Sequence, residues 1–346
     1  MRLLLIGNLA AAPRILGGQH IRTRLVADYL AREFGEKALV RLDLSQPLPL
    51  LLAGFFARVF RCDQVVLLGG PRSLTVFVLL LALCGRLRRT TLVAIGGWLG
   101  DRAAGNALLR RLVLPGVAHI FVETATIRAA VQAQVPAARL SLLPNFRAPV
   151  PCPPAPSGRF RGQGLRLVFL SRLCRSKGLY LAIHAVEALR AAGEDVTLDL
   201  YGPRESDAGA ELDRHLSPAI RDHGPLPPAE VLQTLQHYDV LLFPSFYPGE
   251  GFAGVLSEAL LSATPVICSD WRSNPEVVRH GETGLVVPTG DSAALAGAIA
   301  ALARDRAQLQ RLSQNARRAA QALRPEDQAQ PLRDHIAALA QQGAAG

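Results

Sequence analysis

The sequence predicts an α/β protein built from two doubly wound domains with parallel sheets. Short apolar runs, which predict buried strands, alternate with helical patterns through residues 1–146 and again through 165–325. A proline-dense segment without periodicity, residues 147–164, separates the two series and predicts a linker. Residues 326–346 predict a C-terminal amphipathic helix that crosses back to the first domain.

Length and composition fit a globular protein with reduced thiols. At 346 residues the chain can hold two cores of ordinary size, and 49% of its residues are apolar. Its five cysteines have no close pairs and no zinc-ligand spacing, which favours a cytoplasmic location. Met1 leads directly into an apolar strand, so no signal peptide is expected. The longest apolar stretch, Leu74–Cys84, is about half of what a bilayer crossing needs.

Positive charge is concentrated in the first half of the chain. Residues 1–150 contain 19 Arg and Lys against 7 Asp and Glu, whereas residues 151–346 contain 19 against 21. This excess predicts a surface that meets an anion, either a lipid-diphosphate acceptor or the inner face of an anionic membrane, with Arg58–Arg61 and Arg86–Arg89 as membrane-facing candidates. A solvated basic face in an arginine-rich genome explains the charge equally well. Nucleic acid is not an expected partner, because no aromatic-rich basic run is present.

The first domain is expected to alternate strands with helices in order. The expected strands are Leu3–Gly7, Ala38–Leu42, Val65–Leu68, Leu92–Ile95, His119–Val122 and Leu140–Leu143, with helices near 21–34, 50–60, 72–86, 102–114 and 124–134. Gly17-Gly18, just before the first helix, would let the backbone approach a ligand closely, although an ordinary flexible loop has the same composition. The chain has no G-x-G-x-x-G motif there, so a dehydrogenase loses its main support.

The second domain repeats the pattern. The expected strands are Leu165–Leu170, Val196–Tyr201, 240–243, 265–268 and 285–287, with helices ending near Ala192, spanning about Ala253 to Ala263, and running from Ser292 to about Leu323. Two such domains joined by a linker form a cleft, and ligands of these sheets lie at the carboxyl ends of the strands.

A glycine-lined loop between a strand and a helix is the main feature of the second domain. It reads Pro248-Gly249-Glu250-Gly251 and precedes the helix that starts near Ala253. Free N–H groups and the positive end of the helix dipole suit a phosphate there. Glu250 precedes the helix and Glu258 lies within it, and carboxylates accept hydrogen bonds from vicinal hydroxyls. This layout fits a nucleotide sugar, although ordinary turn chemistry also places glycines before helices.

Two cations follow the first strand of this domain. Arg172 and Lys177 lie in the segment Ser171–Gly178, and Lys177 is one of only two lysines in the chain. Breaking the anomeric C–O bond of a nucleotide sugar leaves a diphosphate with added negative charge, which two fixed cations can neutralise. Cations at the start of a helix oppose its dipole, which disfavours a purely structural reason for them. With these cations no divalent metal and no other cofactor is expected, and no DxD-like acidic pair lies beside the loop.

Both motifs resemble those of a known family. Gly-Glu-Gly-Phe, a second Glu eight residues on and Ala-Thr-Pro-Val-Ile-Cys-Ser resemble the donor-site signature of GT-B glycosyltransferases, in particular the large retaining family called glycosyl transferases group 1 (family 4-like). Ser-Arg-Leu, four residues and Lys-Gly resemble the second donor motif of the same family. The resemblance covers most of the second domain and reaches the first domain mainly through its architecture and Gly17-Gly18.

The resemblance implies a GT-B fold and a retaining transfer of a sugar from a nucleotide diphosphate to a glycan, glycolipid or lipid-linked acceptor. It assigns Glu250 to the transferred sugar, with Arg172 and Lys177 on the diphosphate, as the catalytic set, and Glu258 to the ribose. The leaving phosphate would take the acceptor proton. The substrate-binding residues that it implies are Gly17, Gly18, Asn145, Gly202, Leu226, Gly251, Phe252, Ala253, Gly254, Val255 and Glu258. Glu276 matches a weaker family position.

The first domain departs from the family pattern. Many relatives carry a histidine after the fourth strand, whereas this chain reads Gly96-Gly97-Trp98-Leu99 there. Trp98 either stacks on a sugar face or is simply a packing residue. Two alternatives to the transferase stay open: a sugar-nucleotide epimerase or hydrolase of the same fold, and a non-catalytic nucleotide-sugar binding partner.

Overall fold

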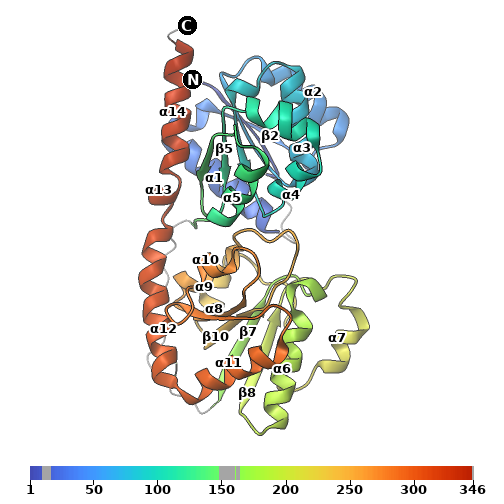
Figure 1. Ribbon diagram of the computed structural model, residues 1–346, viewed down its shortest axis with the longest axis vertical. Coiled ribbons are helices and arrows are strands. Elements are labelled where there is room, and N and C mark those ends of the chain that lie inside the picture. The colour runs from blue at the N-terminus through green and yellow to red at the C-terminus, as the bar shows by residue number, and fades with distance from the viewer. Residues whose placement is uncertain (10–16, 148–159, 161–163, 345–346) are drawn as a thin grey trace. The chain divides into compact units, whose positions relative to one another are not determined.

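The computed structural model describes residues 1–9, 17–147, 160 and 164–344, and the chain forms two compact units (Figure 1). The first unit contains Met1–Ala148 and Arg324–Gly346, and the second contains Pro149–Leu323. Most of the predicted linker 147–164, including Cys152, lies outside the described residues. In the described chain, no helix combines the length and the apolar character that crossing a membrane requires.

The first unit is built on a six-stranded parallel sheet in the order β2-β1-β3-β4-β5-β6. Its strands are β1 Leu3–Gly7, β2 Leu39–Asp43, β3 Gln64–Gly69, β4 Thr90–Ala94, β5 His119–Val122 and β6 Leu140–Leu142. β1, β3 and β4 are buried along their whole length, as expected of parallel strands that are covered on both faces. The chain order reverses between β1 and β3, so ligands are expected at the carboxyl ends of these strands.

Helices cover both faces of this sheet. One face packs against α2 Leu48–Val59, α3 Pro71–Leu83, α4 Leu99–Ala104 and α5 Ala125–Gln134. The other face packs against α1 Gly18–Phe34 and the C-terminal α14 Gln330–Ala344. The predicted helix over 102–114 is wrong as a single element, because α4 ends at Ala104 and a separate π-helical turn, Leu109–Val113, follows. Gly105 and Asn106, both poor helix formers, lie at the break.

The C-terminal segment packs on the first unit. After α13 Pro325–Gln328, helix α14 places Leu332 and Ile336 in the core beside α1. The side-chain amide of Gln64 on β3 donates a hydrogen bond of 2.9 Å to the carbonyl of Ile336. The compact units therefore divide at 148/149 and 323/324, where the sequence placed boundaries near 146 and 325.

The second unit has a parallel six-stranded sheet in the order β12-β11-β10-β7-β8-β9. Its strands are β7 Leu165–Leu170, β8 Val196–Tyr201, β9 Ile220–Asp222, β10 Val240–Phe243, β11 Val266–Ser269 and β12 Gly284–Val287. The path runs outward from β7 to β9 and then restarts on the other side of β7 with β10. This is the doubly wound order in which nucleotides bind at the reversal point.

The helices of this unit lie on both sheet faces. One face packs against α6 Leu179–Ala191, α7 Gly209–His215 and α11 Ser292–Arg304, and the other against α8 Val231–Leu235 and α9 Gly254–Leu261, while α12 Arg306–Ala319 adds side chains to both clusters. The single helix predicted over 292–323 is wrong, because the Asp305 side chain caps a new helix by accepting a hydrogen bond of 2.8 Å from the Gln308 N–H. Four short elements were not predicted from the sequence: β9, α7, α8 and α10 Asn274–Val277.

The predicted fold class is confirmed. Two parallel α/β sheets form, and the predicted strands Leu3–Gly7, His119–Val122, Leu165–Leu170 and Val196–Tyr201 have the observed bounds. Strand prediction succeeded because a doubly buried parallel strand is a continuous apolar run, which is visible without any tertiary information.

Candidate functional site

The two predicted motifs of the second unit meet at its reversal point. Residues 171–178 follow β7, and residues 244–253 follow β10, its neighbour in the sheet. Because parallel strands end at the same edge, the two loops leave the sheet side by side. The motifs are far apart in sequence and adjacent in the fold.

Gly178 allows the two loops to touch. Its φ is +79°, in the left-handed region that favours glycine, and a Cβ atom added there would lie 2.1 Å from the carbonyl oxygen of Pro244. The Phe246 N–H donates a hydrogen bond of 2.9 Å to the carbonyl of Ser176. Backbone contact therefore fixes the loop after β10 against the loop after β7.

Lys177 and Glu250 form a buried ion pair between these loops. The Lys177 Nζ lies 2.7 Å from Glu250 Oε2, and the side chains are only 10% and 6% exposed. The Ser245 hydroxyl donates a second hydrogen bond to the same carboxylate oxygen, at 2.5 Å. The resemblance implied separate partners on the donor for these two residues, but in the structure they bind each other. A buried pair of this kind fixes the position of its charges.

Tyr247 joins the two predicted cations and was missed from the sequence. Its ring lies 4.8 Å from Lys177 Nζ and 4.9 Å from the Arg172 guanidinium carbon, which are cation–π distances. Arg172 is more exposed and also pairs with Glu205 at 3.4 Å. The Trp271 indole N–H donates to the Tyr247 carbonyl at 2.8 Å. An aromatic residue three positions before Glu250 was the only available signal.

The predicted phosphate loop leads into α9. Gly251 and Phe252 are buried, and Ala253, Gly254 and Val255 are half-buried at the first turn. Ala253 is the N-cap and has no side-chain acceptor for the N–H groups of that turn. An anionic ligand suits such an end through both its oxygens and its charge. Glu258 is half-buried further along α9.

Gly202 and Leu226, two of the implied substrate-binding residues, lie at the same sheet edge. Gly202, which follows β8, has φ +145°, and an added Cβ atom would lie 1.7 Å from the carbonyl oxygen of Ser171. Its N–H donates to the carbonyl of Gly224 at 2.9 Å. This contact draws the segment of the half-buried Leu226 toward the Arg172 loop. Only glycine allows the approach, because any Cβ atom would overlap Ser171.

A polar cluster between β8 and β9 was not predicted. The Tyr201 and His223 rings stack with centroids 4.8 Å apart and an angle of 13° between their planes. The buried Asp199 carboxylate accepts hydrogen bonds from Arg221 at 2.7 Å and from Tyr238 at 2.8 Å. Burial raises the pKa of Asp199, but the hydrogen bonds from Arg221, His223 and Tyr238 outweigh it and the pKa is lowered. A charged residue inside an apolar strand was the missed signal.

Four of the predicted residues lie in the first unit. Gly17 is the N-cap of α1 and Gly18 its first residue, and both are exposed. Asn145 is buried and accepts a hydrogen bond of 2.7 Å from Arg147. Trp98 is half-buried, packs on the sheet core and donates to the Ile95 carbonyl at 2.6 Å. These contacts show a packing role for Trp98, and its sugar-stacking role stays a prediction.

The carboxyl edge of the first sheet holds two buried charges that the sequence analysis missed. Arg22 on α1 is fully buried, donates to the Leu143 carbonyl at 2.7 Å, and lies 4.4 Å over the Phe146 ring. Burial lowers the pKa of Arg22 to about 10, although Glu123 acts to raise it. Glu123 directly follows β5 and accepts a hydrogen bond of 3.0 Å from the Gly96 N–H.

In the described residues, the three side chains best arranged for a metal are His184, Glu187 and His215, on α6 and α7 rather than on the loops described above. The loops after β7 and β10 carry the cations Arg172 and Lys177, and the second loop leads to the N–H groups at the start of α9. The expected independence from metal stays a prediction.

Sequence comparison finds a family model and relatives that match the second unit. Residues 164–305 match the family model described as glycosyl transferases group 1. The chain is 31% identical to the amylovoran biosynthesis glycosyltransferase AmsK of Erwinia amylovora over 152 residues. This alignment covers 42% of this chain and 37% of that protein. It is 34% identical to a phosphatidyl-myo-inositol mannosyltransferase of Mycobacterium leprae over 143 residues. This alignment covers 41% of this chain and 38% of that protein. The matched regions thus span well under half of these relatives.

Solved structures resemble the whole chain. A sucrose-phosphate synthase from Thermosynechococcus elongatus has a TM-score of 0.73 at 19% identity and covers 99% of both chains. Anabaena HepE in complex with UDP-glucose has a TM-score of 0.70 at 18% identity, covering 100% of this chain and 98% of that one. These neighbours establish the GT-B fold for both units.

Proposed function

From the match of residues 164–305 to the glycosyl transferases group 1 model, we propose that the protein transfers a sugar from a nucleotide diphosphate sugar to an acceptor hydroxyl. The observation that carries the proposal is the buried Lys177–Glu250 pair at the reversal point of the second sheet. Glu250 lies four positions before Gly254, where α9 begins, so the pair holds a cation against the loop that leads to the N–H groups proposed for the diphosphate.

In the proposed step, the bond between the anomeric carbon and the diphosphate oxygen breaks, and a bond from that carbon to the acceptor oxygen forms. The acceptor proton moves to the departing phosphate oxygen, so no protein base is needed. Lys177 has three N–H donors, of which Glu250 accepts one. The ammonium is therefore held in place while it can still meet the charge that develops on the leaving group. Arg172 is the second cation.

Retention of the anomeric configuration and independence from metal belong to this proposal. With the leaving group and the acceptor on the same face of the sugar, the new bond forms on the face that the phosphate leaves. Glu250 is committed to Lys177 and Ser245, which disfavours a covalent glycosyl-enzyme on this carboxylate. The two cations and the helix N-terminus supply the positive charge that a metal would otherwise provide.

Donor and acceptor classes are proposed from the comparisons and from charge. The HepE structure is a complex with UDP-glucose, which supports a uridine nucleotide as the first donor to try. The relatives named for amylovoran biosynthesis and for phosphatidyl-myo-inositol support a glycan, glycolipid or lipid-linked acceptor. We accordingly place the protein in the cytoplasm, in the assembly of a cell-envelope polysaccharide or glycolipid.

The test combines a nucleotide panel with two variants. UDP, GDP, ADP and dTDP are compared by thermal shift with and without chelator, since a ligand that binds only the folded state raises the melting temperature. Glu258→Ala is expected to weaken the shift of the cognate nucleotide. Lys177→Ala is expected to lower transfer by about 10²–10³-fold in kcat with a smaller effect on nucleotide affinity. Lys37→Ala changes the other lysine, which is exposed, and is expected to leave both kcat and nucleotide affinity unchanged.

Product analysis separates the alternatives. Transfer to a second molecule supports the proposal, whereas free sugar or an isomerised nucleotide sugar as the only product would identify a hydrolase or an epimerase. If the protein binds the nucleotide without any turnover, and the Lys177→Ala variant binds it equally well, the protein is a non-catalytic nucleotide-sugar binding partner. Loss of the thermal shift on adding chelator would contradict metal independence.

A further inference from the structure

Large exposed apolar side chains are confined to one unit. Within the described residues, every large hydrophobic side chain classed as exposed belongs to the first unit. They are Met1, Leu48, Leu50, Phe56, Phe60, Val76, Leu83, Leu108 and Leu112. Scattered single apolar residues need no explanation, but eight within 65 consecutive positions form a pattern that marks an interaction surface.

Apart from Arg58 near its end, helix α2 turns apolar side chains outward. Its inner face buries Leu51, Phe55 and Val59 against the sheet. Its outer face and the residue that ends it carry Leu48, Leu50, Ala53, Phe56, Ala57 and Phe60. Leu48, Leu50, Phe56 and Phe60 are 62%, 64%, 51% and 63% exposed. A helix on the surface of a soluble protein normally turns polar side chains outward, and one that is apolar all round is normally covered.

Helix α3 extends this surface. The Phe55 and Phe77 rings meet edge to face with centroids 5.5 Å apart, so α2 and α3 lie side by side on the sheet (Figure 1). On α3, Val76 and Leu83 are 49% and 85% exposed. The apolar surface therefore spans two neighbouring helices, and we call it the α2–α3 face.

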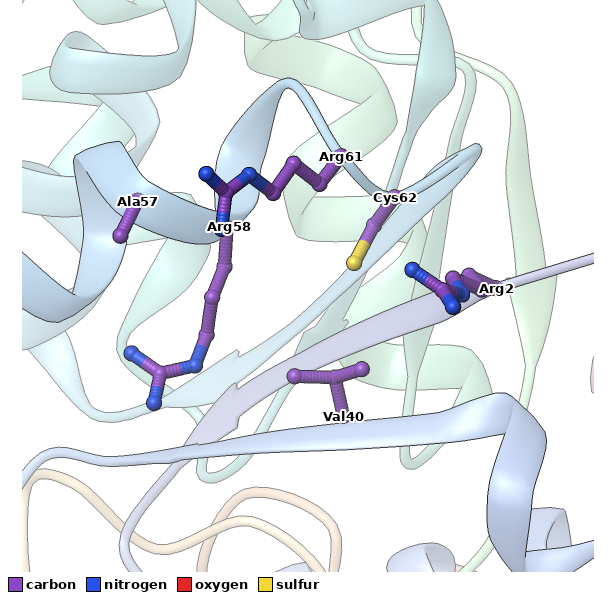
Figure 2. A pocket seen from close by; sticks show the side chains of 6 residues that line it. All are labelled: Arg2, Val40, Ala57, Arg58, Arg61 and Cys62. Carbon is purple, nitrogen blue, oxygen red and sulfur yellow. The ribbon is translucent and has the colours of Figure 1, made fainter.

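A basic hollow lies at the end of α2. It has a volume of about 240 Å³ and is lined by Arg2, Val40, Ala57, Arg58, Arg61 and Cys62 (Figure 2). Three of the six lining residues are arginines and none is acidic. Arg58 donates to the Gly54 carbonyl at 3.0 Å, which holds its chain along the helix. Guanidinium groups bind phosphate oxygens through paired N–H donors, and the three that line this hollow make its charge positive.

A second arginine segment adjoins this hollow. Arg86 donates hydrogen bonds to the carbonyls of Cys62 and Asp63, the latter at 3.3 Å. Arg88 and Arg89 follow in an exposed turn. The two arginine segments suggested by the sequence therefore lie together, at the edge of the α2–α3 face where α2 and α3 end.

We propose that the α2–α3 face docks on a bilayer of anionic phospholipids, with a lipid phosphate in the hollow lined by Arg2, Arg58 and Arg61. Apolar side chains that enter the acyl boundary beside basic residues at the head groups are the arrangement of a peripheral membrane surface. A nucleic acid would use the arginines but not the phenylalanines. A second copy of the chain would place its own arginines near these, which opposes a symmetric contact. This surface is distinct from the proposed transfer site, and its test does not depend on transfer activity.

The test is vesicle flotation of the full chain. Vesicles of phosphatidylcholine alone are compared with vesicles that contain phosphatidylglycerol, at low and at high salt. Binding is expected only with the anionic lipid and is expected to weaken at high salt, because surface charges are screened. Arg58→Gln with Arg61→Gln is expected to weaken binding by about 25-fold, at about fivefold for each charge. Arg317→Gln, on the exposed side of α12 in the second unit, is the charge control and should change nothing.

The apolar part is tested separately. Phe56→Ser with Phe60→Ser is expected to reduce binding at least tenfold while the melting temperature is kept, because both side chains are exposed. Phe60→Trp should show a blue shift of its emission on vesicles, and Gln310→Trp, exposed on α12, should not.

Three results would overturn the proposal. Equal binding to neutral and anionic vesicles would exclude the basic hollow as the anchor. Vesicle binding unchanged in the phenylalanine variant, together with tight binding of an RNA oligonucleotide, would make this a nucleic-acid surface. A dimer in solution that the phenylalanine variant dissociates, with no vesicle binding by either protein, would make it a contact between copies.

Discussion

At the scale of single residues, the site depends on one ion pair and one glycine. Lys177 and Glu250 are 73 positions apart and meet at 2.7 Å. Removing one member of a buried pair leaves the other charge without compensation, which usually costs more than the pair contributes. The main contribution of the pair is therefore to hold the Lys177 ammonium in one position. The backbone contact between the two loops determines where that position is.

Gly178→Ala tests this dependence on backbone. The left-handed conformation alone costs a non-glycine residue about 1–2 kcal/mol, and the added Cβ atom would lie 2.1 Å from the Pro244 oxygen, so the loop must move. We expect a loss of about 3 kcal/mol in the free energy of unfolding, measured by urea denaturation, and a fall in transfer activity because Lys177 is displaced.

Gly193→Ala is the matched control for this variant. Gly193 also has a positive φ, +85°, but an added Cβ atom would meet nothing within 4 Å. This variant should therefore show only the conformational loss of about 1–2 kcal/mol and keep its activity. Equal losses of stability in the two variants would show that the contact with Pro244 does not hold the loop.

At the scale of elements, α14 joins the first sheet through an unusual ring pair. His335 lies on α14 and His119 on β5, and their ring centroids are 4.7 Å apart. The pKa of His335 is lowered to about 4, first by burial and then by the nearby His119 and Arg139. Burial and Arg139 also lower the pKa of His119. Both rings therefore stay neutral in the folded protein as the solution becomes mildly acidic.

The attachment of α14 is expected to weaken in acid. Between pH 6.5 and about 4, the unfolded chain binds a proton at His335 that the folded chain does not. The free energy of unfolding therefore falls as the pH falls through this window and is fully retained above it. We expect a loss of roughly 2 kcal/mol between pH 7 and pH 4, which is less than the full shift implies because the ring is partly exposed.

Urea unfolding at several pH values checks this expectation. His335→Phe keeps a ring beside His119 and Phe121 but cannot bind the proton, so its stability should fall less between pH 7 and pH 4 than that of the parent protein. His237→Gln changes an exposed histidine and should leave the pH dependence as it is. A slope unchanged in the His335 variant would assign the acid sensitivity to other groups.

At the scale of the whole molecule, the first unit is built from two separate stretches of the chain, with the second unit between them. The chain leaves the second unit at Leu323 and completes the first unit with α13 and α14. Ala329, Leu332 and Ile336 are buried in the cluster formed with α1 and the first sheet. The first unit is therefore finished only by the last residues of the chain.

Truncation after Leu323 is expected to damage one unit selectively. Losing the buried Leu332 and Ile336 side chains alone removes about 4 kcal/mol of apolar burial from the first unit. Hydrogen exchange should rise in β1 and β3, while peptides from β7 and β8 keep their protection. The control truncation after Gln341 removes fewer residues and keeps Ile336. It should leave the hydrogen exchange of both units unchanged. Equal loss of protection in both units would contradict the division described above.

The sequence alone determined the fold class, most strands and the two donor motifs. Each of these depends on a short contiguous stretch: an apolar run for a buried strand, or glycines beside charged residues for a ligand loop. Prediction from the sequence failed at Asp305, where a polar residue ends one helix and caps the next. It also failed for elements of three to seven residues such as β9 and α7.

Only the tertiary structure decided which residues share a contact. The pairing of Lys177 with Glu250, the position of Tyr247 between two cations and the stack of Tyr201 on His223 all join separate strand ends. The same holds for the bond from Gln64 to the carbonyl of Ile336, 272 positions away. Local patterns specify elements because backbone geometry repeats over a few residues. Contacts depend on the path of the chain through both sheets, which no short stretch of sequence contains.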